Sequence, residues 1–487
     1  MKWLGSKLSD HIFKKGKFIT PWNNALGNRS KMLSWSQNRL PEYFWLCLIL
    51  DKYGRIVGLE KSCLILKKLH EISGDISVPA FSLILKLNEE EQNKLYSYII
   101  TIIDKESLTP LTLLYTYSEY PDFSRSFCNP KIPLVNRQRI ISDVMKKSYF
   151  HQSEFATDIR FLVLYFLLLK GNLHMSKEQF DLILEYPYLE HSDAKMRIIR
   201  PTIRSMEMMI LNFEILNTQF LEDFWRRIST MGECDLFYIN FAENKQDASK
   251  YIELLHETFQ YLSGYFKAIR PLDKKMIVLL GIATYSYKRL IEITEHELYN
   301  TIAARGTVRT VIENYIMIKY LIKNEDTQEN IWDKFQYYGI GLYKVVLAKS
   351  RETEDDLSDS HIDYKYIELL VNEYMDEEYI DMDTSYFDKQ NIRGKAIAVG
   401  EKQLYGLYYD YDSSFEHGLW GAIRESSLLK CESPAHQFHC VPDYENKQNL
   451  KNVWPDCVMV MNKILGLLNE LYNIPEGLFK EVMKFGN

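Results

Sequence analysis

Apolar residues recur along most of the chain at the three- and four-residue spacing of an amphipathic helix. The segment PEYFWLCLILDKYG shows the pattern with its boundaries, because Pro41 suits a first helical turn and Gly54 suits a helix end. Similar patterns predict helices near 58–73, 78–87, 90–104, 109–117, 138–150, 155–169, 176–185, 203–228, 248–268, 272–298, 300–323, 328–349, 396–409 and 453–472. These patterns predict an all-α fold.

Composition supports the same fold class. The 487 residues include 21 glycines and 14 prolines, which supply little turn chemistry, while apolar residues make up 46% and charged residues 26%. The longest apolar run, 161–169, is too short to span a bilayer and suits a buried helix. We therefore expect a helical protein without a membrane segment.

Interruptions of the helical pattern predict the domain boundaries. Residues 1–40 form a basic, polar segment that we expect to be a solvated arm, followed by an N-terminal multi-helix domain over 41–240. Its helices would form a globular domain or an irregular solenoid. Residues 119–137 contain three prolines and predict an irregular connection, and 229–247 lack helical periodicity and predict the domain boundary. DLFYINF in that boundary would form a strand only with a partner.

The C-terminal helical bundle domain is expected over 248–487, with an acidic insertion over 352–388 that predicts a surface helix with flexible flanks. The net charge of −7 argues against broad coating of nucleic acid. Seven scattered cysteines do not resemble a secreted disulfide framework, and the N-terminus lacks a signal-peptide core. We expect a reducing, cytoplasmic location.

The first candidate site lies on the helix TIAARGTVRTVIENYIMIKYL. Arg305, Arg309 and Glu313 are spaced four apart and share one helix face. Glu313 lies in an apolar run, so its carboxylate needs a partner, and Arg309 is one turn away. A structural ion pair and a functional site both fit this pattern.

The second candidate site lies in YDYDSSFEHGLWGAIRES. Tyr411, Ser414 and His417 follow at three-residue spacing, and Gly418 leaves room for a close neighbour or a ligand. An imidazole beside a hydroxyl is suited to proton transfer near neutral pH. A hydrogen-bonded core histidine is the alternative interpretation.

A third group of residues could ligate zinc. Four thiol or imidazole groups fall within ten residues, and they are Cys431, His436, His439 and Cys440. Their spacing matches no standard zinc module, so we expect incidental clustering in a loop and zinc that is absent or substoichiometric. No cofactor motif is present.

Residues 250–475 resemble a bacterial family known as domain of unknown function 5677. The resemblance rests on the helix with Arg305, Arg309 and Glu313 and on the Tyr-rich segment that ends in Ser414-x2-His417-Gly418. It implies an all-helical bacterial domain and carries no settled activity. The acidic insertion is longer than the resemblance leads us to expect.

Helical domains in which Arg and His face one cleft are also similar to the HEPN ribonucleases, which act in phage defence or toxin systems, usually as dimers. By this analogy we expect a bacterial defence or toxin protein whose second domain cleaves RNA or acts on a nucleotide without a metal, and a homodimer. His417 would transfer the proton, Arg309 and Arg305 would stabilise the phosphorane, and Glu313 would orient Arg309. The N-terminal helices would bind a protein partner or sense a trigger. The rival is a non-enzymatic scaffold or sensor subunit.

Overall fold

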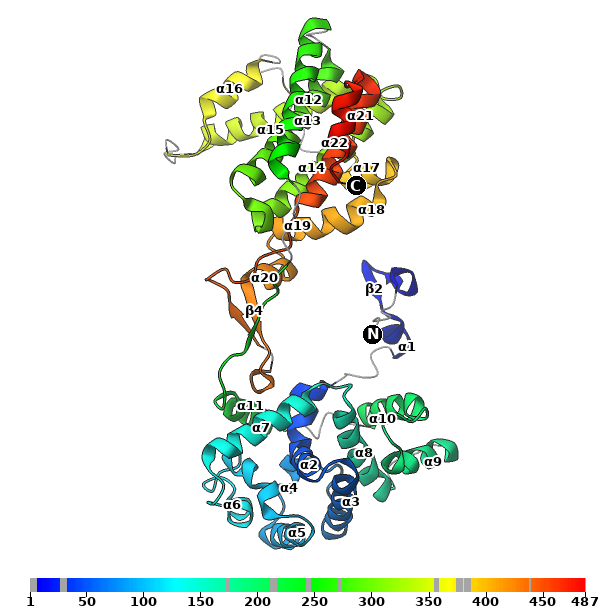
Figure 1. Cartoon of the computed structure of the whole chain (residues 1–487), viewed down its shortest axis with the longest axis vertical. Coiled ribbons are helices and arrows are strands. Elements are labelled where there is room, and N and C mark those ends of the chain that lie inside the picture. Colours follow the sequence, from blue (N-terminus) through cyan, green and yellow to red (C-terminus); the bar gives the residue numbers. More distant parts are fainter. Residues whose placement is uncertain are drawn as a thin grey trace. The chain divides into compact units, whose positions relative to one another are not determined.

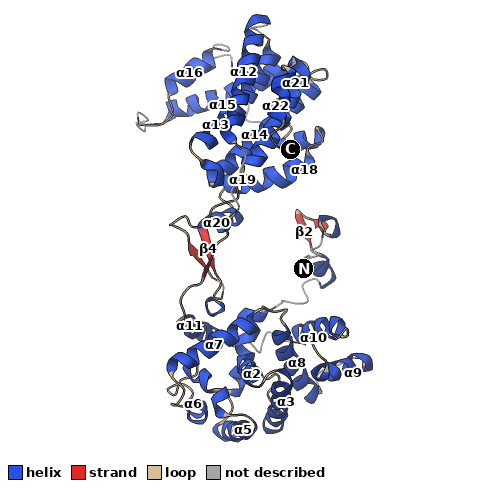
Figure 2. Ribbon diagram, in the orientation of Figure 1, coloured by secondary structure: helices blue, strands red, loops and turns tan. Residues whose placement is uncertain are grey.

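The structure is a computed structural model. It describes residues 7–26, 33–171, 176–210, 217–241, 247–269, 273–353, 359–373, 380, 387–437 and 439–486. Helices make up most of it (Figure 2), and the described strands are few and short, which confirms the all-α prediction. The described strands are short: β1 (Ile12–Lys14), β2 (Lys17–Ile19), β3 (Leu236–Phe237), β4 (Leu428–Cys431) and β5 (Cys440–Pro442). None of the described helices has the length and apolar surface that a bilayer crossing requires.

The chain divides into two compact units. The first contains residues 1–237 and 430–441, and the second contains 238–429 and 442–487. The sequence pattern predicted one domain boundary in 229–247 and a single domain after it. Residues 430–441 differ from that division because backbone pairing joins them to the first unit: β3 pairs antiparallel with β4, with Leu236 opposite Cys431. The strand expected in DLFYINF thus finds its partner about two hundred residues downstream.

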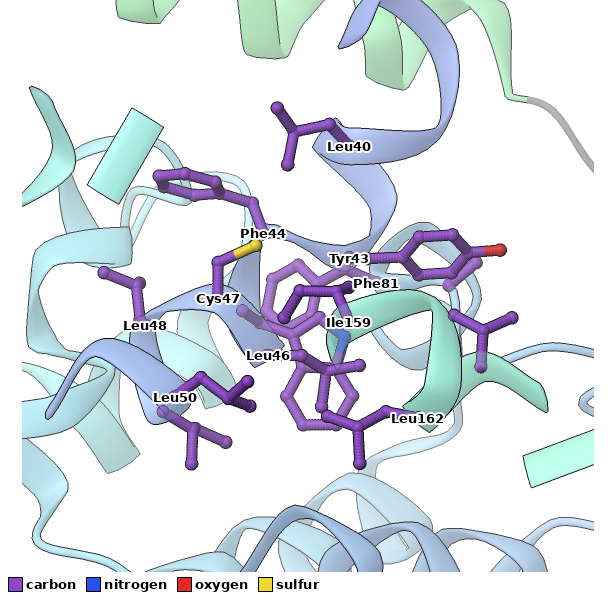
Figure 3. Packing of buried hydrophobic residues seen from close by; sticks show 14 of the residues in the cluster. Leu40, Tyr43, Phe44, Leu46, Cys47, Leu48, Leu50, Phe81, Ile159 and Leu162 are labelled. Carbon is purple, nitrogen blue, oxygen red and sulfur yellow. The ribbon is translucent and has the colours of Figure 1, made fainter. Parts of the chain in front are cut away.

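The first unit surrounds one apolar helix, α2 (Leu40–Tyr53) (Figure 1). All residues from Leu40 to Leu50 are buried, because the helix is apolar on nearly every side and packs against its neighbours all round. Figure 3 shows its side chains meeting Phe81, Ile159 and Leu162. This packing around a central helix differs from the serial stacking of a solenoid. Gly54 ends α2 with φ of 73°, a conformation that favours glycine.

The other helices of the first unit follow in chain order: α1 (Pro21–Leu26), η3 (Trp35–Arg39), α3 (Arg55–Ile72), α4 (Phe81–Ile84), α5 (Glu89–Ile102), η5 (Thr109–Leu113), α6 (Pro121–Phe127), α7 (Leu134–Tyr149), α8 (Glu154–Leu169), α9 (Lys177–Glu185), α10 (Met196–Ile210), α11 (Thr218–Ser229) and η11 (Pro434–His436). Short η1 (Leu8–Asp10), η4 (Lys105–Ser107) and η6 (Tyr186–Tyr188) complete it.

Two expectations for this unit were wrong. Residues 119–137 contain α6 and the beginning of α7, because Pro121 occupies a first helical turn, where its missing N–H is harmless. The solvated arm expected over 1–40 ends early, since Trp35 and Arg39 are both 3% exposed and line the core. The indole Nε1 of Trp35 donates a hydrogen bond to the backbone oxygen of Ser148 at 2.9 Å.

The second unit is built around α14 (Ile302–Asn324), which packs against α13 (Lys274–Glu295), α19 (Asp410–Glu416) and α21 (Trp454–Tyr472) (Figure 1). The Thr301 hydroxyl caps α14 by accepting from the Ala304 N–H. The remaining elements are α12 (Ala248–Ile269), η8 (Leu298–Asn300), α15 (Ile331–Glu352), α16 (Tyr364–Asn372), α17 (Ile392–Ala398), α18 (Lys402–Leu404), η10 (Tyr405–Tyr409), α20 (Trp420–Ser427) and α22 (Glu476–Met483).

The acidic insertion contains the helix expected within it. α16 packs against α15, and Val371 joins Leu347 and Ile380 in a small apolar cluster of its own. The flanks expected to be flexible include 354–358, 374–379 and 381–386, which lie outside the described residues.

Candidate functional site

Three polar side chains predicted to share a face of α14 do so on successive turns. Arg305 is 5% exposed, whereas the side chains of Arg309 and Glu313 are about one quarter exposed, at 24% and 26%. The rest of the helix is largely buried in the core of the second unit. The charged groups therefore lie along one edge of α14, at the border of the core, where each needs a hydrogen-bond or ion-pair partner.

Arg309 and Glu313 meet a tyrosine that the sequence analysis did not single out. Arg309 Nη2 donates to the Tyr409 hydroxyl at 2.7 Å, and that hydroxyl donates to Glu313 Oε2 at 3.2 Å. The guanidinium also lies 4.7 Å from the Tyr409 ring centroid and 3.6 Å from the Glu313 carboxylate. Burial and the Glu313 charge raise the pKa of Tyr409, so the hydroxyl stays a donor. The three groups hold one another as a structural ion pair would, although the buried Nε of Arg309 makes no hydrogen bond with any described residue.

Arg305 points elsewhere, toward carboxylates from two other helices. Its Nη2 donates to the backbone oxygen of Lys451 at 2.6 Å, while its buried Nε makes no hydrogen bond with any described residue. Asp412 in α19 and Asp456 in the first turn of α21 both feel its positive charge. Arg305 thus joins three packed helices, and one of its N–H groups lacks a hydrogen-bond partner among the described residues.

A cavity of about 390 Å³ opens beside Arg305. It is bounded by Arg305, Val308, Leu407, Tyr408, Tyr411, Asp412, Lys451, Asn452 and Asp456. We refer to it as the Arg305 cavity. A hollow with convergent charged groups is where a ligand or substrate is expected to bind.

The two carboxyl groups of this cavity are poised for proton transfer. Burial raises the pKa of Asp412 from its ordinary 3.8 to about 7; Arg305 opposes the rise, and Asp456 adds to it. Burial also raises the pKa of Asp456, again against the pull of Arg305. Near neutral pH this pair holds a proton that solvated carboxyls would have lost, which is the condition for acid–base chemistry.

His417 and its predicted companions do not form one polar group. His417 follows the last turn of α19, is exposed, and its ring makes no hydrogen bond or ion pair with any described residue. The Ser414 hydroxyl donates to the backbone oxygen of Tyr411, and the Tyr411 hydroxyl donates to Glu425, both at 2.7 Å. Of the three, only Tyr411 lines the Arg305 cavity.

Asp412 and Asp456 are the functional candidates that the sequence analysis missed. Asp412 lies three residues before Phe415, and both are buried, so helical periodicity could have placed it on the inner face of α19. Asp456 follows Pro455 in a first helical turn, where acidic residues are common for reasons of helix polarity alone. Its sequence context therefore gave no signal.

The suspected zinc ligands lie in the first unit. The structure gathers Cys431, His436 and His439 together with Cys234, and it leaves Cys440 out of the group. Cys234 was missing from the candidates because it precedes the others by about two hundred residues. Its approach depends on the β3–β4 pairing.

Comparison with known proteins gives one family. Residues 274–436 match a family of unknown function, DUF5677, which confirms the resemblance for this part of the chain. The matched region contains α14, α19 and Asp412, while Asp456 lies beyond it. Neither the curated proteins nor the solved structures include a significant match.

Proposed function

We propose that the second unit binds a phosphate-bearing substrate, RNA or a nucleotide, in the Arg305 cavity and cleaves it by acid–base catalysis without a catalytic metal. The observation that carries the proposal is a buried carboxyl, Asp412, whose pKa of about 7 is set beside a buried arginine. A carboxyl with a pKa near the working pH is an effective general acid. The aligned arginine supplies fixed positive charge where a phosphorane develops.

The charge in the cavity suits an anionic substrate. Arg305 and Lys451 contribute two positive charges, and Asp412 and Asp456 contribute a single negative charge when Asp412 is protonated. The balance is then positive despite the two carboxyls. The negative charge of the carboxyls also explains why Arg305 is tolerated in a buried position, since it offsets the charge of the guanidinium.

In RNA cleavage the carboxyl pair would carry both proton transfers. The ionised carboxyl, assigned to Asp456, takes the proton from the 2′-hydroxyl, and the 2′-oxygen then attacks phosphorus. Asp412, whose pKa of about 7 keeps it protonated longer, gives a proton to the departing 5′-oxygen. Arg305 donates hydrogen bonds to the non-bridging oxygens as their charge grows. The products are a 2′,3′-cyclic phosphate and a free 5′-hydroxyl.

This assignment moves the proton transfer from His417 to Asp456 and Asp412, because both carboxyls line the cavity and His417 does not. His417 remains a competing prediction that the same assay tests. Arg309 takes a positioning role, since Tyr409 and Glu313 already engage its guanidinium. It would hold η10 against α14 and so support Tyr408, which lines the cavity.

An activity of this kind fits a bacterial defence or toxin protein acting in the cytoplasm. Unregulated RNA cleavage would arrest growth, so the first unit would serve as the part that binds a protein partner or senses a trigger. A homodimer remains the assembly that the HEPN analogy suggests.

The test is an RNA cleavage assay with the purified full chain. A labelled single-stranded RNA of mixed sequence is incubated in buffer without divalent cations, and a DNA of the same sequence serves as the substrate control. We expect cyclic-phosphate ends from RNA, no cleavage of DNA, and loss of activity in Asp412→Asn. Expression of the wild type should slow growth, and expression of Asp412→Asn should not.

Matched variants separate the hypotheses. Asp410→Asn removes an exposed carboxyl from the same helix and should keep full activity. A folded His417→Ala protein without activity, together with an active Asp412→Asn protein, would return the proton transfer to His417. If the wild type leaves RNA, ATP, GTP and NAD all intact, the proposal is wrong, and a scaffold or sensor function becomes the better explanation.

A further inference from the structure

Four side chains of metal-binding type converge in the first unit. Cys234 lies between α11 and β3, Cys431 ends β4, His436 ends η11, and His439 lies just before β5. One ligand atom of each lies within 4.8 Å of the corresponding atom of every other. Two thiols and two imidazoles form the donor set of many tetrahedral zinc sites.

The separations match those of ligands around one zinc ion. Cys234 Sγ lies 3.5 Å from His436 Nδ1 and 3.2 Å from His439 Nε2, and Cys431 Sγ lies 3.5 Å from His436 Nδ1. Zn–S bonds of about 2.3 Å and Zn–N bonds of about 2.0–2.1 Å at tetrahedral angles place sulfur and nitrogen about 3.6 Å apart. The side chains are thus spaced as the ion requires.

The surroundings of His436 select the tautomer that can bind a metal. Its Nε2 lies 3.1 Å from the backbone oxygens of both Ser229 and Gly232. Carbonyl oxygens only accept hydrogen bonds, so Nε2 carries the proton and Nδ1 presents a lone pair to the two sulfurs. Histidine ligands of zinc are oriented by just such a bond from the other ring nitrogen.

Backbone hydrogen bonds hold the cysteine ligands in place. The Cys431 N–H donates to the His439 oxygen at 2.8 Å, which closes the loop that carries His436. The Ser433 N–H donates to Cys431 Sγ at 3.4 Å, an interaction that favours a thiolate. The pairing of Leu236 with Cys431 brings Cys234 to the same place.

We propose that Cys234, Cys431, His436 and His439 bind one Zn²⁺ ion that has a structural role. With four protein ligands the coordination sphere is complete, which is typical of structural rather than catalytic sites. The ion would tie residues 430–441 to the end of α11 and so complete the fold of the first unit. This reverses the expectation from spacing alone, and it does not rest on the proposed RNA cleavage.

The first test is metal analysis of the full chain after purification without chelators. We expect one zinc per chain in the wild type. When Co²⁺ replaces the zinc, the protein should show the visible d–d bands and the thiolate charge-transfer band of a tetrahedral Cys₂His₂ site. Zinc content near zero in the wild type, in protein shown to be reduced, would refute the proposal. A Cys234–Cys431 disulfide found in unreduced peptides would refute it as well.

Two serine variants locate the site. Cys234→Ser should lose zinc and the cobalt spectrum, whereas Cys440→Ser, an exposed thiol next to His439, should keep both. Retention of zinc in Cys234→Ser with loss in Cys440→Ser would show that the assigned ligands are wrong. If Cys234→Ser does not fold, the wild-type metal content and cobalt spectrum still decide the question.

A different observation in the first unit supports a second site. A cavity of about 1110 Å³ is lined by basic side chains from η3, α7, α8, α10 and β4, and none of the described residues that line it is acidic. The basic residues are Arg39, Lys146, Arg160, Arg204 and Lys430. We refer to it as the basic cavity.

Buried arginines at this cavity exceed their carboxylate partners. Arg39 and Arg160 are 3% and 4% exposed, and both pair with the same buried carboxylate, that of Glu207. The Nε of each arginine makes no hydrogen bond with the described residues. Arg204 donates hydrogen bonds to Thr157 and to the Gln152 backbone. It feels the charge of Glu154 but forms no ion pair within the described residues. Buried positive charge in excess calls for an anion.

We infer that the basic cavity binds a small phosphate-bearing molecule, with a volume that would admit a nucleotide. Such a ligand would be the trigger sensed by the first unit. Isothermal titration calorimetry of the full chain would use ATP, pyrophosphate and sulfate as probes. We expect ATP or pyrophosphate to bind, and Arg204→Gln to weaken binding at least about tenfold by removing a charge-assisted contact.

The control is Arg197→Gln, an exposed arginine on the same helix that lies outside the cavity, and it should bind like the wild type. Equal losses in both variants would reveal only general charge attraction and overturn the inference. So would the absence of binding by both phosphate probes, or sulfate binding as tight as theirs.

Discussion

Replacing Asp412 by Asn provides a direct test of the acid–base site, because its effect on stability depends on pH. Asp412 is 4% exposed and its carboxyl has a pKa of about 7, compared with 3.8 when solvated. Between these values the folded state keeps a proton that the unfolded state has released. Stability therefore falls as the pH rises through this window and levels off above pH 7.

The magnitude follows from the two pKa values. From about pH 5 to about pH 8, the wild type should lose about 2–3 kcal/mol of folding free energy through this one group. The amide introduced by Asp412→Asn carries no charge to bury, so the variant lacks this loss. The stability of the variant relative to the wild type should rise by the same amount across that range, whatever constant offset the substitution introduces.

Urea denaturation of the full chain at several pH values would measure this difference. Hydrogen exchange of peptides from α14 and α19 would assign the transition to the second unit, since a chain of two units need not unfold in one step. Asp410→Asn, which removes an exposed carboxyl from the same helix, is the matched control. A flat difference for Asp412→Asn would mean that the carboxyl ionises as a solvated one does, and the argument for a general acid would fail.

The remaining predictions concern the same unit. If Asp412 is the acid, kcat/KM for RNA should fall as the pH rises above about 7, and a profile that stays level between about pH 6 and 9 would argue against it. Lys395→Met should destabilise the protein by about 3–5 kcal/mol in urea, because Lys395 is 0% exposed and Asp388 would lose its cationic partner. Exposed Lys402→Met is the control. Equal urea midpoints for the two variants would contradict the reasoning. Tyr409→Phe should lower the free energy of unfolding by about 1–3 kcal/mol, since Arg309 and Glu313 lose the hydroxyl to which both hydrogen-bond. RNA cleavage should persist in this variant. Loss of cleavage in a stably folded Tyr409→Phe protein would give the cluster a catalytic role.

The fold class and the local helices could be read from the sequence because they depend on periodicity, and periodicity is local. The pattern after Pro41 predicted a helix that ends at Gly54, and α2 ends there. The spacing of Arg305, Arg309 and Glu313 placed them on one edge of α14, where they lie. Helical geometry converts such spacing into direction without reference to the rest of the chain.

Contacts between distant segments could not be read in this way. From spacing alone, Arg305 and Arg309 were both expected to stabilise a phosphorane. Tertiary packing instead places Arg309 against Tyr409, and it places Arg305 near Asp412 and Asp456. Burial then decided which carboxyl titrates near neutral pH, and burial is a property of the packed helices. His417 had the right chemistry by residue type but lies exposed at a helix end.

The cysteine–histidine group shows the same division most clearly. The sequence supplied Cys431, His436 and His439 in one loop, and their spacing matched no known module. The fourth side chain, Cys234, joins them only because β3 pairs with β4. Residue types and local periodicity were determined by the sequence alone, whereas the tertiary structure decided which of these residues meet, since that depends on long-range packing that no local pattern encodes.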